Sequence, residues 1–85
     1  MAKQFNLSIL APEKVVYEGK AVSLVAPSEW GYLGVLANHA PFFCKVGSGK
    51  IIVREDSGRI EVFYSNTEGF LEVLKNNVTI LLNQL

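Results

Sequence analysis

Histidine and cysteine are almost absent from this 85-residue sequence, which contains one of each, His39 and Cys44. One cysteine cannot close a disulfide within the chain, and a zinc site of the usual composition needs more ligands than these two. No window approaches the ~18 apolar residues of a membrane-spanning helix. We therefore expect a protein of a reducing compartment, with no disulfide, metal, cofactor or membrane insertion.

Net charge is absent too, because eight basic and eight acidic residues balance. Nucleic-acid binding usually requires a basic surface, so this class of function is not expected. The hydrophobic fraction is 49%, and neutral proteins resist association poorly. These totals indicate that a partner covers part of the surface.

Apolar and polar residues alternate along most of the chain, which is the pattern of half-buried β-strands. The predicted strands contain Phe5, Leu7 and Ile9, then Val22, Leu24 and Ala26, then Phe42, Cys44 and Val46, followed by residues 50–55, 59–65, 70–74 and 78–82. Tight turns are expected at 56–58 and 75–77, where Asp, Gly and Asn stand. We predict one all-β domain over residues 1–85, either a sandwich or a barrel.

Two motifs could carry chemistry, and both have a simpler explanation. VGSGKI at residues 46–51 resembles a phosphate-binding loop, but Cys44 and Ile51 stand where that motif needs Gly and Ser or Thr. His39 and Cys44 could form a base and a thiol nucleophile, which would require a lowered thiol pKa and a third, orienting group. Cys44 lies on the apolar side of its predicted strand, so a buried structural cysteine is favoured. We expect no enzyme.

Two large aromatic residues, Trp30 and Tyr32, stand in what is expected to be a loop between strands. Aromatic side chains in a polar loop often anchor a partner, since they bury much area at low entropic cost. They could equally fold back over the core. The sequence leaves both possibilities open.

Four motifs stand in order along essentially the whole chain. They are FxLxILxPEKVVYEG at residues 5–19, VAPSExGxLGVLxxHAP at 25–41, GFLEV at 69–73 and NxVTIL at 76–81. Together they resemble the epsilon subunit of F-type ATP synthases. The resemblance implies a flattened β-sandwich of about ten short strands in two sheets.

The resemblance also implies a function in the central stalk of a rotary motor. The subunit would dock on the gamma subunit and on the c-subunit ring, and would help to couple proton- or sodium-driven rotation to ATP synthesis. It would be non-catalytic. The implied location is peripheral, on the cytoplasmic face of the inner or plasma membrane, in a bacterial or organelle-encoded complex.

The resemblance assigns contact residues as well. The loop that would face the c-ring consists of Ser28, Glu29, Trp30, Gly31 and Tyr32, and the positions that would contact gamma are Ala11, His39, Phe42, Phe43, Cys44 and Thr67. Ala37-Asn38 replace the usual Pro-Gly before the histidine, and Asn can adopt the left-handed conformation, so the turn is expected to form. Tyr32 replaces a frequent acidic residue, which leaves Glu29 as the carboxylate of the loop.

The end of the sequence and one rival interpretation complete these expectations. Most family members continue into a C-terminal pair of helices that can inhibit ATP hydrolysis, whereas this sequence ends at Leu85. Either the natural protein is short or the sequence is a piece of a longer one, and we expect these 85 residues not to inhibit hydrolysis. The rival interpretation is a carrier domain of the lipoyl or biotinyl type, also a small β-sandwich, or another small binding module. A carrier needs a modified lysine at a hairpin tip, and Lys75 lacks the usual flanking residues.

Overall fold

The computed structural model describes residues 3–66 and 68–83, and all regular secondary structure among them is β-strand. The strands are β1 (Phe5–Ala11), β2 (Lys14–Ala21), β3 (Ser23–Ser28), β4 (Gly31–Leu36), β5 (Phe42–Val46), β6 (Gly49–Arg54), β7 (Ile60–Ser65), β8 (Gly69–Leu74) and β9 (Asn77–Leu82). The all-β prediction is confirmed. The described residues form nine strands, against about ten expected.

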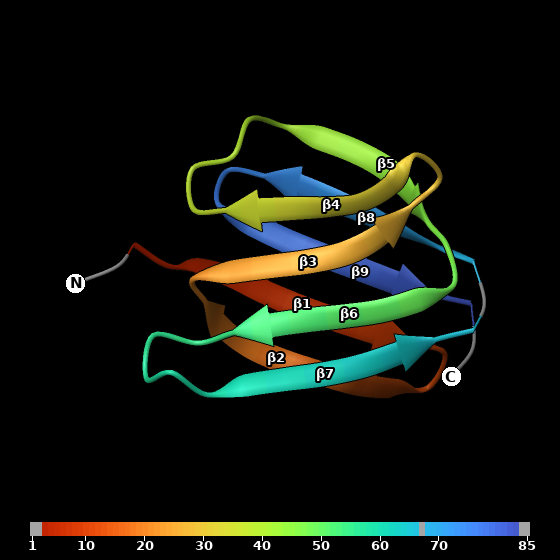
Figure 1. Cartoon of the computed structure of the whole chain (residues 1–85), viewed down its shortest axis with the longest axis horizontal. Helices are drawn as coiled ribbons and strands as arrows, with labels where there is room; N and C mark the ends of the chain where they lie inside the picture. The colour runs from red at the N-terminus through yellow and green to blue at the C-terminus, as the bar shows by residue number, and fades with distance from the viewer. Residues whose placement is uncertain (1–2, 67, 84–85) are drawn as a thin grey trace.

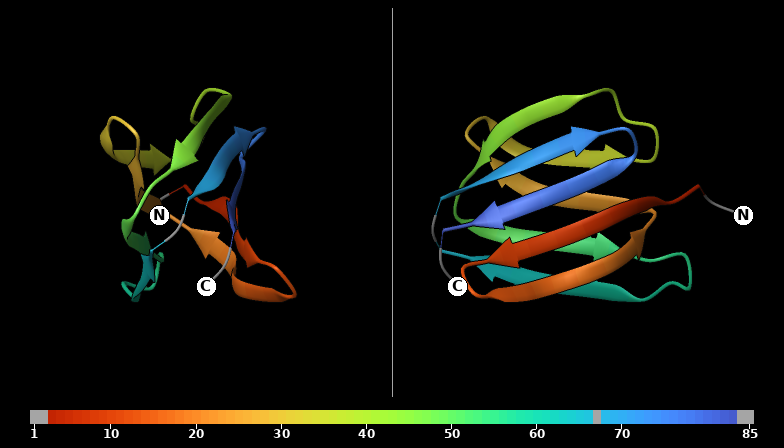
Figure 2. Two further views of the ribbon diagram at one scale, coloured as in Figure 1. Left: turned by 90° about the vertical axis from the view of Figure 1, so that its right-hand side faces the viewer. Right: turned by 180° about the vertical axis from the view of Figure 1, so that it is seen from behind.

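The strands form one hydrogen-bonded ladder in the order β2-β1-β9-β8-β5-β3-β6-β7, with β4 added to β3. The ladder folds over between β5 and β3, which share a single register pair, Ser28 and Val46. Two layers result, as Figure 2 shows edge-on in its left view. We call β2-β1-β9-β8-β5 the first layer and β4-β3-β6-β7 the second layer (Figure 1). The two expected sheets are therefore two layers of one continuous ladder.

One apolar core lies between the layers, because alternate residues of the strands point inward. Its largest fully buried side chains are Phe5, Leu7, Ile9, Leu24, Ile51, Leu71, Ile80 and five valines. Complete burial of such a side chain stabilises the fold by about 1.5–3 kcal/mol. Leu24 and Ala26 are buried as predicted, whereas Val22 is half-buried because it precedes β3 at an open end of the sandwich.

Two strands were not predicted from the alternation of residues. β2 carries a mixed pattern because its register shifts by a β-bulge between Ile9 and Leu10 of β1. β4 was expected to be part of a loop, since glycines at 31 and 34 interrupt the apolar run. The placement of Tyr32 in a loop was therefore wrong: it lies on β4, in register with Pro27 of β3.

Candidate interaction surfaces

The β3–β4 hairpin ends in a two-residue loop, Glu29 and Trp30, between the paired residues Ser28 and Gly31. Ser28 Oγ donates a hydrogen bond to the Gly31 carbonyl at 2.6 Å and accepts one from the Trp30 amide at 3.2 Å. Gly31 adopts a φ of +114°, which residues with side chains rarely take. Ser28 and Gly31 thus fix the shape of the tip, at one end of the sandwich (Figure 1).

The two aromatic residues of this hairpin differ in their surroundings. Trp30 is 74% exposed at the tip. Tyr32 accepts a hydrogen bond on its Oη from the Lys50 amide at 3.1 Å, and the same oxygen lies where a side chain at Gly49 would stand. Neither ring folds back over the core: Tyr32 is held to the second layer through its hydroxyl and is 61% exposed, and Trp30 projects from the tip. A contact of either ring with a partner stays a prediction.

The turn that holds His39 is organised by two asparagines. Asn38 has a φ of +63°, and its amide donates to Asn76 Oδ1 at 2.8 Å. Asn76 Nδ2 in turn donates to the Gln4 carbonyl at 2.8 Å. The imidazole of His39 packs edge-on against Phe42, with ring centroids 5.8 Å apart. The expected turn thus forms, with Asn38 in the left-handed conformation.

Cys44 is 4% exposed and belongs to the core. Burial raises the pKa of its thiol, and the carboxylate of Glu29 raises that pKa further. A nucleophilic cysteine needs the opposite shift. His39 Nδ1 lies 2.7 Å from the Ala40 carbonyl instead of pairing with the thiol. In the described part of the chain these two residues do not form a catalytic pair.

The phosphate-loop motif and a possible metal site also lack the structure and ligands that they need. Gly47, Ser48 and Gly49 lead into strand β6, whereas a phosphate-binding loop leads into a helix. No group of three or more His, Cys, Asp or Glu that could hold a metal lies within residues 3–66 and 68–83. Over the same residues, no helix is long and apolar enough to cross a membrane.

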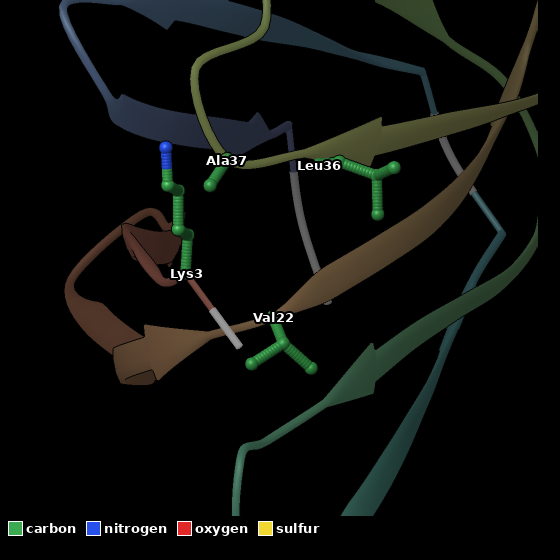
Figure 3. A pocket seen from close by; sticks show the side chains of 4 residues that line it. All are labelled: Lys3, Val22, Leu36 and Ala37. Carbon is green, nitrogen blue, oxygen red and sulfur yellow. The ribbon is translucent and has the colours of Figure 1, made fainter. Parts of the chain in front are cut away.

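A shallow pocket of about 250 Å³ opens at the end of the sandwich where the chain begins. Lys3, Val22, Leu36 and Ala37 line it (Figure 3). Three of these side chains are aliphatic, and the fourth supplies a single amine. The pocket therefore places no acid–base pair and no second polar side chain beside the amine of Lys3.

The outward side of the first layer is unusually apolar. Phe43 of β5 is 62% exposed and stacks on Phe70 of β8, with ring centroids 5.5 Å apart and an interplanar angle of 17°. The register then continues from Phe70 to Leu81 of β9, Leu10 of β1 and Val15 of β2. We call the outward side chains Phe43, Phe70, Leu81, Leu10 and Val15 the first-layer face. It crosses five strands, or about 19 Å at ~4.8 Å per strand.

The residues expected to contact gamma do not form one compact patch. Phe43 lies on the first-layer face, and Cys44 lies beneath it in the core. Ala11 ends β1, whereas the turn of His39 is joined through Asn76 to Gln4, which precedes β1, and Phe42 packs against His39. Thr67 falls outside the described residues. The expected c-ring residues, 28–32, are brought together in one hairpin.

Sequence reasoning missed the residues that extend the first-layer face. Alternation within residues 70–74 and 78–82 places Phe70 and Leu81 on the outward side of their own strands. Only the register between strands aligns them with each other and with Leu10. Their exposure in predicted strands was the one signal that could have indicated a shared surface.

Across residues 3–66 and 68–83, these features describe a small β-sandwich with exposed apolar side chains and an aromatic hairpin. The chain belongs to the family described as ATP synthase, Delta/Epsilon chain, beta-sandwich domain, whose family model matches residues 4–85. The resemblance noted in the sequence is thereby confirmed.

Individual relatives agree with this assignment. The ATP synthase epsilon chain of Leptospira borgpetersenii serovar Hardjo-bovis is 39% identical over 80 residues, which cover 94% of this chain and 61% of the relative. The chloroplastic epsilon chain of Tetradesmus obliquus is 41% identical over 79 residues, covering 93% and 57%. The chain thus spans about three fifths of the length of these relatives.

Solved structures share the fold. A chain in the Euglena gracilis mitochondrial ATP synthase, in a structure of OSCP, F1 and the c-ring, superposes with a TM-score of 0.86 at 20% identity, covering 93% of this chain and 50% of that chain. A chain in the Tetrahymena thermophila central stalk and c-ring structure gives 0.78 at 14% identity, covering 98% and 66%.

Proposed function

We propose that this chain acts in the central stalk of a proton- or sodium-driven F-type ATP synthase, where it docks on gamma and on the c-ring. It helps to couple ring rotation to ATP synthesis and catalyses no reaction itself. The family assignment supports this function, as do the titles of the two structural neighbours, which name central-stalk and c-ring assemblies. The exposed Phe43–Phe70 stack is the single observation that carries it.

Gamma is assigned to the first-layer face. Exposed aromatic pairs of this kind are costly to leave in water and are typical anchors of protein interfaces. The charged residues around the stack are mixed, since Lys45 pairs in register with Phe70 and Glu72 with Phe43. An apolar surface with charges of both signs around it suits a partner surface that is also apolar and carries both signs of charge. His39 and Ala11 would then lie at the two ends of the contact.

The c-ring is assigned to the hairpin tip. Ser28 and Gly31 hold the loop, so that Glu29 and Trp30 project without any rearrangement. Trp30 supplies apolar contact area, and Glu29 supplies the one charge. Such a preformed tip suits a ring of short polar loops, because little entropy is lost when it binds.

This assignment gives the subunit a peripheral location on the cytoplasmic side of the membrane that holds the ring. Reconstitution tests it: an ATP synthase assembled without this subunit is supplied with the 85-residue chain, and ATP-driven ion pumping is compared with ATP hydrolysis. We expect the ratio of pumping to hydrolysis to rise. If the chain binds the complex and the ratio stays unchanged, the coupling function is wrong.

A separate measurement, of intact mass, tests the rival carrier function. A carrier needs Lys75 or another tip residue to hold a covalent group, so the intact mass of chain purified from its native cells would exceed the mass of the sequence. We expect the unmodified mass. A lipoyl or biotinyl increment on Lys75 would favour the carrier.

A further inference from the structure

Strand β4 is an edge of the second layer with one free side. Within residues 3–66 and 68–83, β4 pairs with β3 on one side and with no strand on the other. The strands β2 and β7 end the main ladder, so β4 is the third edge of the sandwich. A free edge presents unpaired backbone amides and carbonyls, and proteins usually protect such an edge with charges, proline or a bulge.

β4 differs from the other two edges because it has none of these protecting features. β2 carries Lys14, Glu18 and Lys20, and its pairing with β1 contains a bulge. β7 carries Glu61, which is half-buried on the inward side and forms an ion pair with Arg59. The sequence of β4 is GYLGVL, without a charge or a proline, and its register with β3 is regular. We therefore expect the free side of β4 to be covered by another strand.

The backbone groups on the free side of β4 belong to Tyr32, Gly34 and Leu36. The Pro27 carbonyl accepts a hydrogen bond from the Gly47 amide at 3.0 Å, so the backbone of Pro27 points away from β4. Its register partner Tyr32 therefore points its own backbone groups away from β3. Because this direction alternates along a strand, Gly34 and Leu36 point the same way as Tyr32. The amides and carbonyls of these three residues are thus aligned along the edge.

Side chains leave this edge accessible to a second backbone. Tyr32 leans over the second layer, where its hydroxyl accepts a hydrogen bond from the Lys50 amide of β6. Gly34 has no side chain, and nothing lies within 4 Å of the position that one would take. Glycine within a strand often marks a place where another backbone approaches closely. Leu36 is exposed and supplies an apolar contact at the end of the strand.

We propose that the free edge of β4 pairs with the β4 edge of a second copy of this chain, antiparallel and about a two-fold axis at Gly34. In this register Gly34 stands opposite Gly34 of the second copy, and Tyr32 of each copy stands opposite Leu36 of the other. The second layers of both copies then form one continuous sheet. The proposed c-ring contact uses the same hairpin, so the pair is a form of the undocked chain.

The edge is self-complementary, which favours a second copy over a partner of another sequence. Three edge residues are symmetric about Gly34, so a two-fold pairing uses all of them. No like charges meet, because β4 carries none, and the net charge of zero does not oppose association. β4 runs from the hairpin tip toward Leu36, so the antiparallel direction brings Glu29 of one copy toward Lys3 of the other, which lies beside Leu36 and Ala37.

Sedimentation equilibrium of the 85-residue chain tests this proposal, and hydrogen exchange locates the contact. We expect the average mass to rise from that of one chain toward that of two as the concentration is raised to about 1 mM. The Gly34 amide should exchange more slowly at the higher concentration, whereas the Val62 amide on the β7 edge should not change. The mass of one chain at every concentration, or slower exchange confined to β7 or to the first-layer face, would overturn the proposal.

Charged variants test the register at the centre of the pair. Gly34→Lys sets two like charges opposite each other, so we expect the pair to weaken at least about tenfold, a difference of about 1.4 kcal/mol. Gly34→Glu should do the same, and a mixture of the two variants should pair again, with one chain of each kind. Val62→Lys adds the same charge to the β7 edge and is the matched control, which should pair as the unchanged chain does.

Amide NMR spectra show whether each variant is folded. If a Gly34 variant does not fold, Leu36→Lys decides, because it replaces the apolar contact at the end of the edge and should also weaken the pair. Undiminished pairing of Gly34→Lys or, in that case, of Leu36→Lys, a mixture that stays single-chain, or an equal loss in Val62→Lys would overturn the proposal.

Discussion

The hydroxyl of Tyr17 on β2 donates a hydrogen bond to Oε2 of Glu55 at 2.5 Å, and this bond joins the two layers beside the end strands of the ladder. The ring of Tyr17 also meets Phe63 of β7 edge-on, with centroids 5.9 Å apart. Where β2 and β7 end the ladder, side chains therefore link the layers.

Because Tyr17 is buried and bonded to Glu55, the free energy of unfolding should change with pH in the alkaline range. Burial, the hydrogen bond and the charge of Glu55 raise the pKa of Tyr17 from 10.0 to about 12. The folded state thus keeps the phenol proton longer than the unfolded state does. The resulting stability is complete below about pH 10 and is lost as the pH rises toward about 12.

Tyr17→Phe removes both the bond and this titration. At about pH 8 it should lower the free energy of unfolding by about 0.5–1.5 kcal/mol. Urea unfolding of both proteins across alkaline pH measures the difference, in which the titration of lysines common to both cancels. The difference should shrink above about pH 10. A difference that stays constant to pH ~12 would contradict this explanation.

The hairpin aromatics should separate binding from stability. Trp30→Ala should leave the melting temperature nearly unchanged, because the side chain is 74% exposed, and should lower coupled pumping in the reconstituted complex. Tyr32→Ala should lower the melting temperature, since it removes the partner of the Lys50 amide. The reverse pattern, with Trp30 required for stability and not for pumping, would show that the tip is not a contact.

Asn76 should prove central to the turn that holds His39. Its side chain bonds both the Asn38 amide and the Gln4 carbonyl, and its own φ is +63°. Asn76→Ala loses both bonds and strains the backbone, so we expect a loss of about 2–3 kcal/mol.

Asn76→Gly keeps the backbone conformation accessible and loses only the bonds, so it is the control and should cost less. Hydrogen exchange of the Asn38 amide should accelerate in both variants. Unchanged exchange at Asn38 would mean that the turn holds without Asn76.

Gly69 and Gly34 form a matched pair of strand glycines. A side chain at Gly69 would collide with the Leu81 carbonyl of β9, whereas Gly34 faces open space. Gly69→Ala should therefore destabilise the fold by about 1–3 kcal/mol. Gly34→Ala should stabilise it slightly, by at most about 0.5–1 kcal/mol. Denaturant unfolding measures both, and equal effects would contradict the assigned packing.

Much of the fold could be predicted from the sequence, because alternation alone separates inward from outward residues. Phe5, Leu7 and Ile9 are buried as the pattern requires. The alternation did not predict β4, because glycine at position 34 has no side chain that marks an inward or outward face. Gly34 lies in a strand because it pairs in register with Val25 of β3. Pairing between distant segments is a property of the folded sheet, and a local pattern does not contain it.

The candidate surfaces were predicted only in part. The hairpin 28–32 is local in sequence, so its residues were found together. The partners of Phe43 were not, because Phe70 and Leu81 reach it through the β5–β8 and β8–β9 ladders. Cys44 was assigned both to the core and to a contact with gamma. Its burial beneath the first-layer face is consistent with the former, and its role toward gamma stays a prediction.

The central claim is that the first-layer face binds gamma, and titration calorimetry with purified gamma tests it most directly. Phe43→Ser and Phe70→Ser each remove one ring of the stack, whereas Tyr64→Ser removes a ring from the second layer that is about as exposed as Phe43. We predict that each of the first two weakens the affinity by at least about tenfold, a loss of about 1.4 kcal/mol or more, and that the third leaves it unchanged. Full affinity in the Phe43 and Phe70 variants, with a loss in the Tyr64 variant, would contradict the account.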